Sequence, residues 1–450
     1  MLALDRREGR LRLADNLIPR AIGEGVSLRT RPGAQQVIEG QIARAVAWGS
    51  HIVFERDGRL LAWIGAQTFD LAPAGTTLSA ATYQAPIGNA QREDRLFIAD
   101  GVNPLWHITP TAPTPHFVRN EIVQPSGRPY PLEPARSVAT WRDRLWYTWG
   151  TNRAAHSDVR NPSAFDPLWT VEAQGADVQQ VVALVAERDR LLLGCRDETF
   201  AVTGDSQYNF QTRPLLAFGL AGPRAFDRLT GDSSLLVAPQ GVYSSASGAS
   251  LDEDLRPLLA ARQYGAEVAV DLGRRLALVY LSGRVFVASL DAPGLWGELA
   301  VNASGLLRLD STVGWYGPDG VWMLARDGAP DRRADGAETE VVAAWETWWT
   351  IPPTDDLTGR SLLEHAELVV RASRGTLVYT ASSPHASCAA PRDLATDGRA
   401  TWGDFPGAPH QWPDRAHTLE FTPNLDGEAF VHRLDITGAI EVLSFSPSYR

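Results

Sequence analysis

The sequence contains no lysine and almost no cysteine, and both absences narrow what the protein can be. All 42 basic residues are arginine, against 53 acidic residues, so the formal net charge is −11. A dedicated DNA-binding surface needs clustered positive charge, and this balance argues against one. Cys195 and Cys388 are the only cysteines and lie far apart in the chain. They predict neither a disulfide framework nor a zinc site, and we expect ordinary packed or surface thiols.

Long apolar runs and long amphipathic helices are missing as well. No segment approaches the roughly 20 consecutive apolar residues that span a bilayer. The first residues, MLALDRREGRLRL, are charged where a signal peptide would be apolar, so we expect no classical secretion. Only residues 252–263 have the pattern of a short helix. With 44% hydrophobic and 21% charged residues, the composition is that of a globular protein.

What the chain does contain is one short unit repeated seven times. An apolar run, a tight turn and a second apolar run begin near residues 50, 94, 143, 189, 233, 274 and 311, at intervals of 37 to 49 residues. Strand units with such a period are typical of β-propeller blades, which bury their apolar faces only when stacked around an axis. We predict a propeller of about seven blades over residues 41–335, with the inner strand of each blade starting at the repeated hairpin.

The segments on either side of the repeat differ from it. Residues 1–40 predict an extended arm with short strands near 2–4 and 11–13, placed to add an outer strand to the last blade and close the ring. Residues 336–450 alternate polar and apolar side chains, as half-buried antiparallel strands do. We predict a separate C-terminal β-sandwich, jelly-roll-like in character, so the expected fold class is all-β.

One stretch inside the propeller has the composition of a surface excursion. Proline has no backbone N–H and is excluded from central strands. Residues 107–139 contain seven prolines: Pro110, Pro113, Pro115, Pro125, Pro129, Pro131 and Pro134. We expect a surface excursion here and, if copies of the chain associate, we expect their interface to lie in residues 107–139 and in the C-terminal domain.

No motif in the sequence predicts a catalytic, metal or cofactor site, and we expect no enzyme activity and no cofactor. The run SLDAPGLW (289–296) differs by one position from the Asp-box turn of sialidase-type propellers, which is structural. Glycoside hydrolysis needs two facing carboxyl groups, one of them desolvated. The acidic runs lie in polar segments instead and are interpreted as solvated surface groups: Asp252-Glu253-Asp254, Glu338 with Glu340, and Asp355-Asp356.

Tryptophans near the start of the C-terminal region leave two interpretations open. Trp345, Trp348 and Trp349 would suit either a carbohydrate-stacking platform or packing between domains. Their position at the junction of two expected domains favours packing. The nine histidines show no metal-binding spacing, and His410 and His417 follow proline-rich sequence as loop residues do.

The order of short phrases along the propeller resembles a family of bacteriophage proteins. Residues 136–166 contain a Ser-Asp turn followed by an Asn-Pro-x-x-Phe-Asp phrase. Residues 181–205, 218–226 and 235–248 continue in the same order, ending in a Gly-Val-Tyr turn, and an Arg-x-Arg-Pro-Gly phrase stands at 29–33. The chain is similar in these phrases to tail nozzle, hub and DNA-stabilisation propellers of short-tailed phages. The residues that carry the resemblance, all structural, are Ser157, Asp158, Asn161, Pro162, Phe165, Asp166, Gly241 and Trp345, which opens a Trp-x-Thr phrase.

The resemblance implies a structural virion protein. Such a protein forms a ring, commonly of six copies, that extends the DNA channel of the tail, helps to retain the genome, and docks fibres or spikes. Implied partners are other copies of the chain, tail adaptor or portal-proximal proteins, a fibre or spike, and viral DNA passing without sequence-specific binding. The implied location is the virion tail, after assembly in the host cytoplasm. The alternatives are a carbohydrate-binding or carbohydrate-cleaving propeller used in host recognition, and a cellular propeller scaffold.

Overall fold

Strands are the only regular secondary structure in the part of the chain that the computed structural model describes. That part comprises residues 11–15, 17–22, 25–86, 92–174, 179–251, 265–291, 296–309, 311–325, 330–339, 342–347, 361–383, 387–393, 416–421, 423, 425–427 and 431–449. The chain divides into two compact units. Unit 1 comprises residues 1–37, 285–301 and 323–450, and unit 2 comprises residues 38–284 and 302–322. The strand expected near 2–4 and the helix expected at 252–263 lie outside the described residues.

Unit 2 is a series of antiparallel sheets that follow one another along the chain. Its strands, sheet by sheet, are β5 (Arg44–Trp48), β6 (His51–Arg56), β7 (Arg59–Ile64) and β8 (Gln67–Pro73); β9 (Ser79–Pro86), β10 (Arg92–Ala99), β11 (Trp106–Ile108) and β12 (His116–Phe117); β13 (Val138–Trp141), β14 (Arg144–Trp149), β15 (Arg153–His156) and β16 (Thr170–Glu172); β17 (Ala183–Ala186), β18 (Leu191–Gly194), β19 (Thr199–Thr203) and β20 (Gln211–Leu216); β21 (Phe226–Arg228), β22 (Ser234–Ala238) and β23 (Gly241–Ser244); β24 (Glu267–Asp271) and β25 (Leu276–Leu281); and β28 (Gly305–Leu309) and β29 (Thr312–Gly317).

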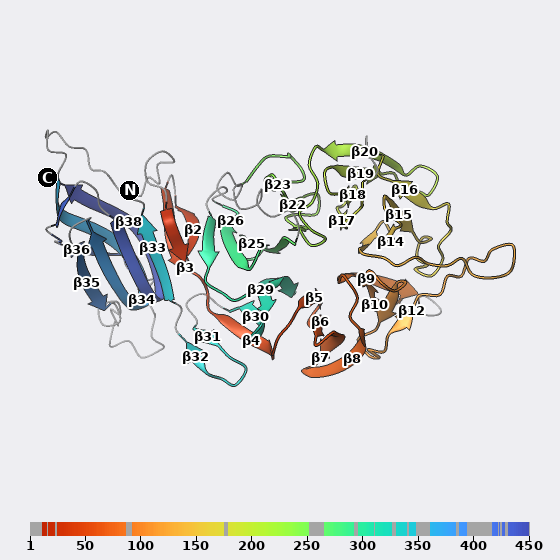
Figure 1. Ribbon diagram of the computed structural model, residues 1–450, viewed down its shortest axis with the longest axis horizontal. Coiled ribbons are helices and arrows are strands. Elements are labelled where there is room, and N and C mark those ends of the chain that lie inside the picture. Colours follow the sequence, from red (N-terminus) through yellow and green to blue (C-terminus); the bar gives the residue numbers. More distant parts are fainter. Residues whose placement is uncertain are drawn as a thin grey trace, which may run out of the picture. The chain divides into compact units, whose positions relative to one another are not determined.

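Figure 1 shows the sheets of this unit arranged around a common centre, and the contacts between their first strands run round it. β5 contacts β9, β9 contacts β13, and β13 contacts β17; further round, β21 contacts β24, and β24 contacts β28. Between β17 and β21 the Arg228 side chain donates to the Ala186 carbonyl at 2.8 Å. Because β28 also contacts β5, the last sheet meets the first and the circle is closed. The all-β propeller predicted from the repeat is therefore the fold of this unit.

The repeated hairpins form the second and third strands of their sheets, so the prediction that they start with the inner strand is wrong by one strand. The hairpin that begins near residue 143 is β14 with β15, and β13 precedes it as the first strand. Middle strands are covered by neighbouring sheets on both faces and therefore show the most continuous apolar sequence. β18 and β22 are buried at every position, and such strands dominate the pattern that the sequence displays.

Side-chain oxygens on the first strands tie each sheet to the next. A first strand lies at the edge of its sheet and leaves backbone N–H groups that need an acceptor. Serine or a carboxylate on the preceding first strand, or directly before it in the case of Ser137, supplies the acceptor in four places: Ser79 Oγ accepts from Val138 N at 3.2 Å, Ser137 Oγ from Leu184 N at 3.0 Å, Asp227 Oδ2 from Val270 N at 2.7 Å, and Glu267 Oε2 from Leu306 N at 2.7 Å. These bonds hold the circle together independently of the apolar cores.

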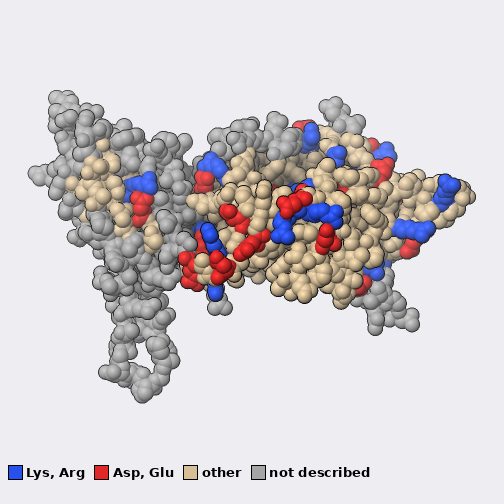
Figure 2. Space-filling view, turned by 60° about the horizontal axis from the view of Figure 1, so that its bottom comes forward, with Lys and Arg blue, Asp and Glu red and all other residues tan. Residues whose placement is uncertain are grey.

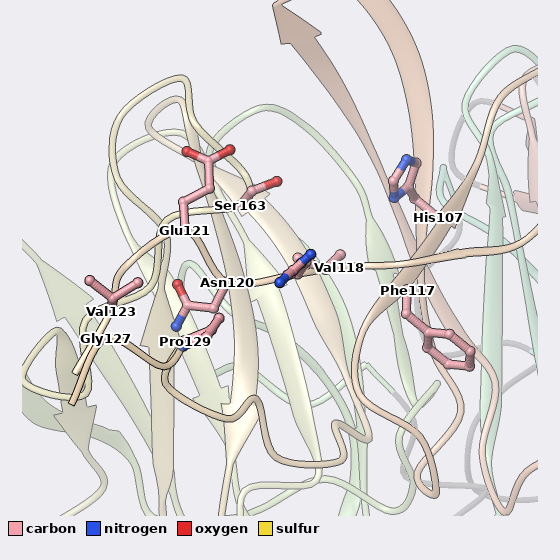
Figure 3. Close-up of a pocket in the computed structure, with 10 residues that line it drawn as sticks. His107, Phe117, Val118, Asn120, Glu121, Val123, Gly127, Pro129 and Ser163 are labelled. Atoms are coloured by element: carbon pink, nitrogen blue, oxygen red, sulfur yellow. The ribbon is translucent and has the colours of Figure 1, made fainter.

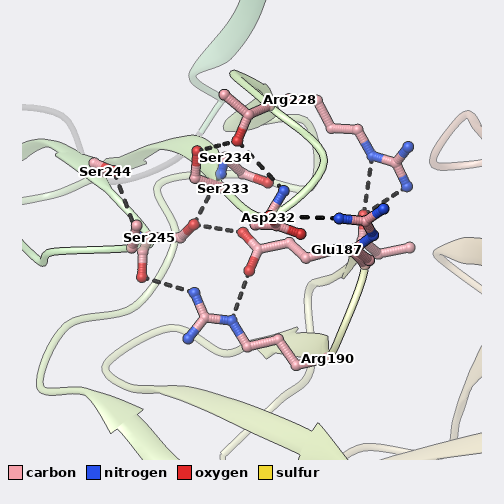
Figure 4. A network of polar contacts seen from close by, with 12 residues as sticks. Glu187, Arg190, Arg228, Asp232, Ser233, Ser234, Ser244 and Ser245 are labelled. Atoms are coloured by element: carbon pink, nitrogen blue, oxygen red, sulfur yellow. Dashed lines mark hydrogen bonds and ion pairs between the residues drawn. The ribbon is translucent and has the colours of Figure 1, made fainter.

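A buried carboxylate links the fourth sheet to the fifth (Figure 4). Glu187 follows β17 and has a side chain only 1% exposed. It accepts from Arg190 Nε at 2.6 Å and from the Ser245 hydroxyl. The same hydroxyl accepts from the backbone N–H of Ser234 at 2.8 Å, and Arg190 also donates to the Ser245 carbonyl at 2.9 Å. Arg190 Nε and the Ser245 hydroxyl therefore both use the Glu187 carboxylate as their acceptor.

Unit 1 contains a sandwich built on two long strands. Its strands are β1 (Leu11–Asp15), β2 (Leu17–Ile22), β3 (Gly25–Thr30), β33 (Val342–Thr347), β34 (Ser361–Ser382), β35 (Ser387–Asp393), β36 (Ala416–Phe421), β37 (Leu425–Gly427) and β38 (Val431–Tyr449). β34 and β38 pair along most of their length, with register shifts that include one between Ala372 and Arg374. On one side of that shift β35 and β33 flank the pair, and on the other side β36 and β3 do. In orthogonal sandwiches, the corners are formed by strands that pass from one sheet to the other at a bulge.

Aromatic side chains from both sides of that register shift pack together in the core of the sandwich. Tyr379, 1% exposed, lies 4.7 Å from the Phe421 ring and 5.8 Å from the Phe445 ring, measured between centroids. Its hydroxyl bonds His432 Nδ1 at 2.8 Å. β34 and β38 each run continuously through this shift, because a bulge interrupts the alternation of side chains without ending the pairing.

The N-terminal arm supplies the outer strand that the sequence predicts from it. β4 (Ala34–Glu39) lies between β30 (Gly320–Leu324) and β31 (Asp331–Arg332), and β32 (Glu338–Thr339) follows β31. Arg31, from the Arg-x-Arg-Pro-Gly phrase, is 5% exposed and forms a bidentate pair with Asp331 at 2.8 and 2.6 Å. Unit 1 also contains β26 (Arg284–Ser289) and β27 (Trp296–Leu299), which pair with each other. Asp15 of β1 pairs in parallel with Glu298 of β27.

Candidate interaction site

The Ser-Asp turn that the resemblance singles out is a buried corner of the third sheet. Ser157 is fully buried, and its Oγ accepts from Leu145 N at 3.0 Å and donates to the Asp158 carbonyl at 2.9 Å. The Asp158 carboxylate accepts from Val159 N at 2.7 Å. Arg144, under the turn, donates to the Ser157 carbonyl at 2.9 Å and lies 3.7 Å from Asp158. Burial lowers the pKa of Arg144, while Asp158 opposes that effect.

The Asn-Pro-x-x-Phe-Asp phrase joins this corner to the proline-rich excursion. Phe165 is fully buried and packs edge-on against Tyr147, with centroids 5.0 Å apart. Its backbone exchanges two bonds with the side chain of Asn120: Phe165 N to Oδ1 at 3.0 Å and Nδ2 to the Phe165 carbonyl at 2.8 Å. Asn161 Nδ2 donates to Glu121 at 2.9 Å. We name residues 157–166 the bracket, because they hold the excursion at Asn120 and Glu121.

The remaining phrase residues stabilise the bracket itself. Pro162 is buried. Asp158 and Asn161 form an isolated bridge, and Asn161 Oδ1 accepts from Ser163 N at 3.1 Å. Asp166 Oδ1 accepts from Leu168 N at 2.9 Å and ends the turn. The structure therefore brings six of the eight sequence-predicted residues together as one structural feature.

The other two predicted residues lie elsewhere. Gly241 is buried and begins β23, paired with Ala238 of β22. Trp345 lies in β33 of unit 1, opposite Ala14 of β1 and Leu434 of β38. Trp348 and Trp349 lie outside the described residues.

A pocket of about 530 Å³ opens where the bracket meets the excursion. Figure 3 shows its walls coming from β11, from the excursion and from the bracket. Its lining residues are His107, Phe117, Val118, Arg119, Asn120, Glu121, Val123, Gly127, Pro129 and Ser163. Phe117 and Val123 are large apolar side chains that are 61% and 54% exposed. Exposed apolar groups beside a hollow are typical of binding surfaces.

Polar groups at the pocket give it a distinct electrostatic character. Burial, with Arg95 and His116 adding to it, lowers the pKa of His107 to about 4, so its imidazole is neutral at neutral pH. Its Nδ1 has no hydrogen-bond partner among the described residues. Arg119 is exposed and forms no ion pair within the described part of the chain. Glu121 accepts from Asn161. The pocket thus combines exposed apolar side chains with an arginine that has no ion-pair partner among the described residues.

A second, smaller cavity of about 200 Å³ lies at the centre of the propeller. Arg224 lines it, and its guanidinium donates to the carbonyls of Ala45 in β5 and Leu306 in β28. It also lies 3.5 Å from Glu267, and Glu267 accepts from the Tyr316 hydroxyl at 2.7 Å. Burial raises the pKa of Glu267 and the Arg224 charge opposes that effect. The donors and acceptors of this cluster satisfy one another, which indicates a structural clasp.

Nothing at either cavity has the geometry of a catalytic or metal centre in the described residues. No group of three or more histidine, cysteine, aspartate or glutamate side chains there is arranged to hold a metal ion. Burial raises the pKa of the Cys195 thiol to about 12, which makes it a poor nucleophile. In the near-miss Asp box, Ser289 Oγ accepts from Asp291 N at 3.2 Å, and residues 292–295 are not described. The acidic run 252–254, Glu340 and Asp355-Asp356 also lie outside the described residues.

Sequence reasoning missed Asn120 and the pocket that it helps to form. Asn120 stands in an irregular segment, so no periodicity marks it. Its partner Phe165 is 45 residues further along the chain. The only local signal is one asparagine and two valines in a proline-rich stretch, at 118, 120 and 123.

Comparisons with known proteins add a likeness in structure only. No protein-family model and no curated protein sequence matches the chain. Among solved structures, the chain is similar to the computationally designed Ika8 protein at 11% identity and a TM-score of 0.40, covering 69% of this chain and 95% of that one. It is similar to BamB from Moraxella catarrhalis at 13% identity and a TM-score of 0.39, over 68% and 92% of the two chains. It is similar to the AfRom2 CNH domain at 12% identity and a TM-score of 0.39, covering 66% of this chain and 99% of that one.

Proposed function

We propose that this chain is a structural ring subunit of a short-tailed bacteriophage tail, in the nozzle or hub. There it extends the DNA channel, helps to retain the genome and docks fibres or spikes. The observation that carries the proposal is the bracket. Six residues of the phrases that resemble phage tail propellers form one buried corner, and this corner holds the excursion and its pocket at Asn120. These phrases therefore have a structural role, which is to hold the excursion against the third sheet.

The charge distribution supports a passage for DNA more than a binding surface. The chain has 53 acidic residues against 42 arginines. On the face drawn in Figure 2, acidic and basic side chains of the described residues are interspersed. A wall that neutralised several phosphates in every subunit would hold DNA with a steep salt dependence and oppose its release. A mildly acidic wall costs little, because screening limits repulsion to roughly 8–10 Å at physiological salt.

The propeller also supplies the mechanical properties that a ring subunit needs. Its sheets are short, their edges are protected, and neighbouring sheets are tied by side-chain bonds as well as by apolar cores. Subunits joined head to tail close into a ring when the rotation between them divides the circle. No helix in the described residues is long and apolar enough to cross a membrane.

The experiment that tests the proposal is native mass spectrometry of the purified full chain, combined with negative-stain micrographs. We expect closed rings of identical copies, six being the number that the family resemblance implies. A protein that stays monomeric and binds a glycan array would contradict the proposal and favour a carbohydrate-binding propeller. Portal, adaptor and fibre genes beside the gene for this chain are the expected genomic context, and their absence would count against a tail role.

A further inference from the structure

The most exposed large apolar side chain among the described residues stands on an ordered turn. Tyr208 is 90% exposed and lies between β19 and β20 of the fourth sheet. Asn209 Oδ1 accepts from the N–H groups of Asp205 and Ser206 at 3.0 and 2.9 Å. Asn209 Nδ2 donates to the Asp205 carboxylate at 2.6 Å, and Ser206 also accepts backbone bonds from Asn209 and Phe210, both at 3.1 Å. We name residues 204–210 the knob.

The two ends of the knob are fixed to the body of the propeller. At one end Gly204 has a φ of +122°, and a Cβ there would lie 2.6 Å from the Asn209 carbonyl, so the tight return requires glycine. At the other end the Phe210 ring packs against Trp146 and His156, each with centroids 5.1 Å away. The knob therefore presents an aromatic side chain to solvent with little conformational freedom to lose on binding, which is typical of an interface anchor.

The pocket beside the bracket has the complementary chemistry. Phe117 and Val123, which lie on opposite sides of the pocket (Figure 3), offer apolar contacts to an aromatic ring between them, and 530 Å³ leaves room for a tyrosine side chain. At the pocket Arg119 has no ionic partner among the described residues, and at the knob the exposed Asp205 carboxylate has no cationic partner among them. Guanidinium groups also stack on aromatic faces. The knob thus offers an aromatic ring and a carboxylate, and the pocket offers a hollow, apolar side chains and a guanidinium group.

We propose that the knob of one copy binds the pocket of the next copy, with Tyr208 between Phe117 and Val123 and Asp205 paired with Arg119. This inference rests on the ring function proposed above and names the contact that builds the ring. Tyr208 is open to solvent within its own chain, so the contact joins two copies. Two different patches meet, the knob on the fourth sheet and the pocket beside the second and third. The interface is therefore head to tail, and an interface of this kind closes into a ring when the rotation between copies divides the circle.

The test uses two variants that each disable one half of the contact. Tyr208→Ala removes the anchor, and Val123→Asp places a charge at an apolar side of the pocket. Both positions are exposed, so both variants should fold. Each alone should weaken self-association roughly tenfold or more in sedimentation experiments. An equal mixture of the two should form dimers that do not grow, because each pair retains one intact knob facing one intact pocket. Leu168→Ala, at a side chain 86% exposed and outside both sites, is the matched control.

The possible outcomes separate this contact from the ring itself. If the wild-type chain forms rings and both variants form them equally well, the knob and pocket are not the interface, while the ring function stands. If the wild-type chain stays monomeric at about 100 μM, a concentration at which even weak specific interfaces associate, then both the ring function and this contact are wrong. Rings from the wild type, loss in both variants and dimers in the mixture would support the proposal.

Discussion

At the scale of single residues, the fold depends on polar side chains placed where apolar packing cannot act. Glu187, Arg224 and Asn120 each satisfy several backbone or side-chain groups that would otherwise be buried without partners. A buried donor or acceptor left without a partner costs more than its bond contributes. Such residues are therefore the most sensitive points of the structure.

The network around Glu187 gives one such prediction. Glu187→Ala leaves the Arg190 guanidinium and the Ser245 hydroxyl without their acceptor, and should reduce the free energy of unfolding by about 2–4 kcal/mol. Asp232→Ala is the control. Asp232 is 62% exposed and lies 4.0 Å from Arg188, so its loss should cost less than about 0.5 kcal/mol. Urea denaturation measures both, and equal effects would contradict the role assigned to Glu187.

Two buried histidines predict a loss of stability in acid. His156 and His432 are 2% and 1% exposed, and burial lowers the pKa of each to about 4. For His156 the Ser157 carbonyl opposes this effect. The unfolded chain titrates near 6.5 and binds more protons between the two values. Stability is therefore complete above pH 6.5 and falls as the pH falls toward 4, by roughly 3 kcal/mol for each histidine.

Denaturation midpoints at pH 7, 5.5 and 4.5 check this dependence. His432→Gln should lower stability at pH 7, because the Tyr379 bond is altered, and should reduce the pH dependence. Imidazole NMR signals of His156 or His432 that titrate near pH 6.5 in the folded protein would refute the prediction.

At the scale of elements, the bracket and the excursion act as one unit. Asn120 is 3% exposed and bonds both polar backbone groups of Phe165. Asn120→Ala should lower the free energy of unfolding by about 1–3 kcal/mol and should also release the excursion. Limited proteolysis between residues 121 and 130 would then be faster than in wild type. Asn152→Ala, which removes a bond to Glu172 on the third sheet, is the control and should leave that cleavage unchanged.

At the scale of the whole molecule, net charge sets the affinity for duplex DNA that we predict. With a net charge of −11 and interspersed arginines, we expect the assembled protein to bind duplex DNA no more tightly than about 10 μM at 0.15 M salt. Fluorescence anisotropy with a labelled duplex measures this affinity. Nanomolar binding that weakens steeply with salt would mean a wall that attracts phosphate, and would overturn the expectation of an acidic lumen.

The sequence by itself determined the fold class and the number of repeats, because both follow from local periodicity. Each blade needs alternating or continuous apolar runs and a tight turn within its own 40 to 50 residues, and these features are legible in one stretch of chain. The Ser157–Asp166 phrase was also visible as a local pattern. The sequence placed the hairpins one strand too far inward, because middle strands are the most apolar.

Only the tertiary structure decided which distant residues meet. Asn120 bonds Phe165 across 45 positions, and Arg224 bonds Ala45 across 179. The sequence around Asn120 and Arg224 gives no signal of these bonds. An asparagine in a loop or an arginine before a strand has the same sequence pattern whether or not its side chain is hydrogen-bonded. The pocket and the knob depend likewise on how segments stack around the axis. Long-range packing fixes such geometry, and no local pattern encodes it.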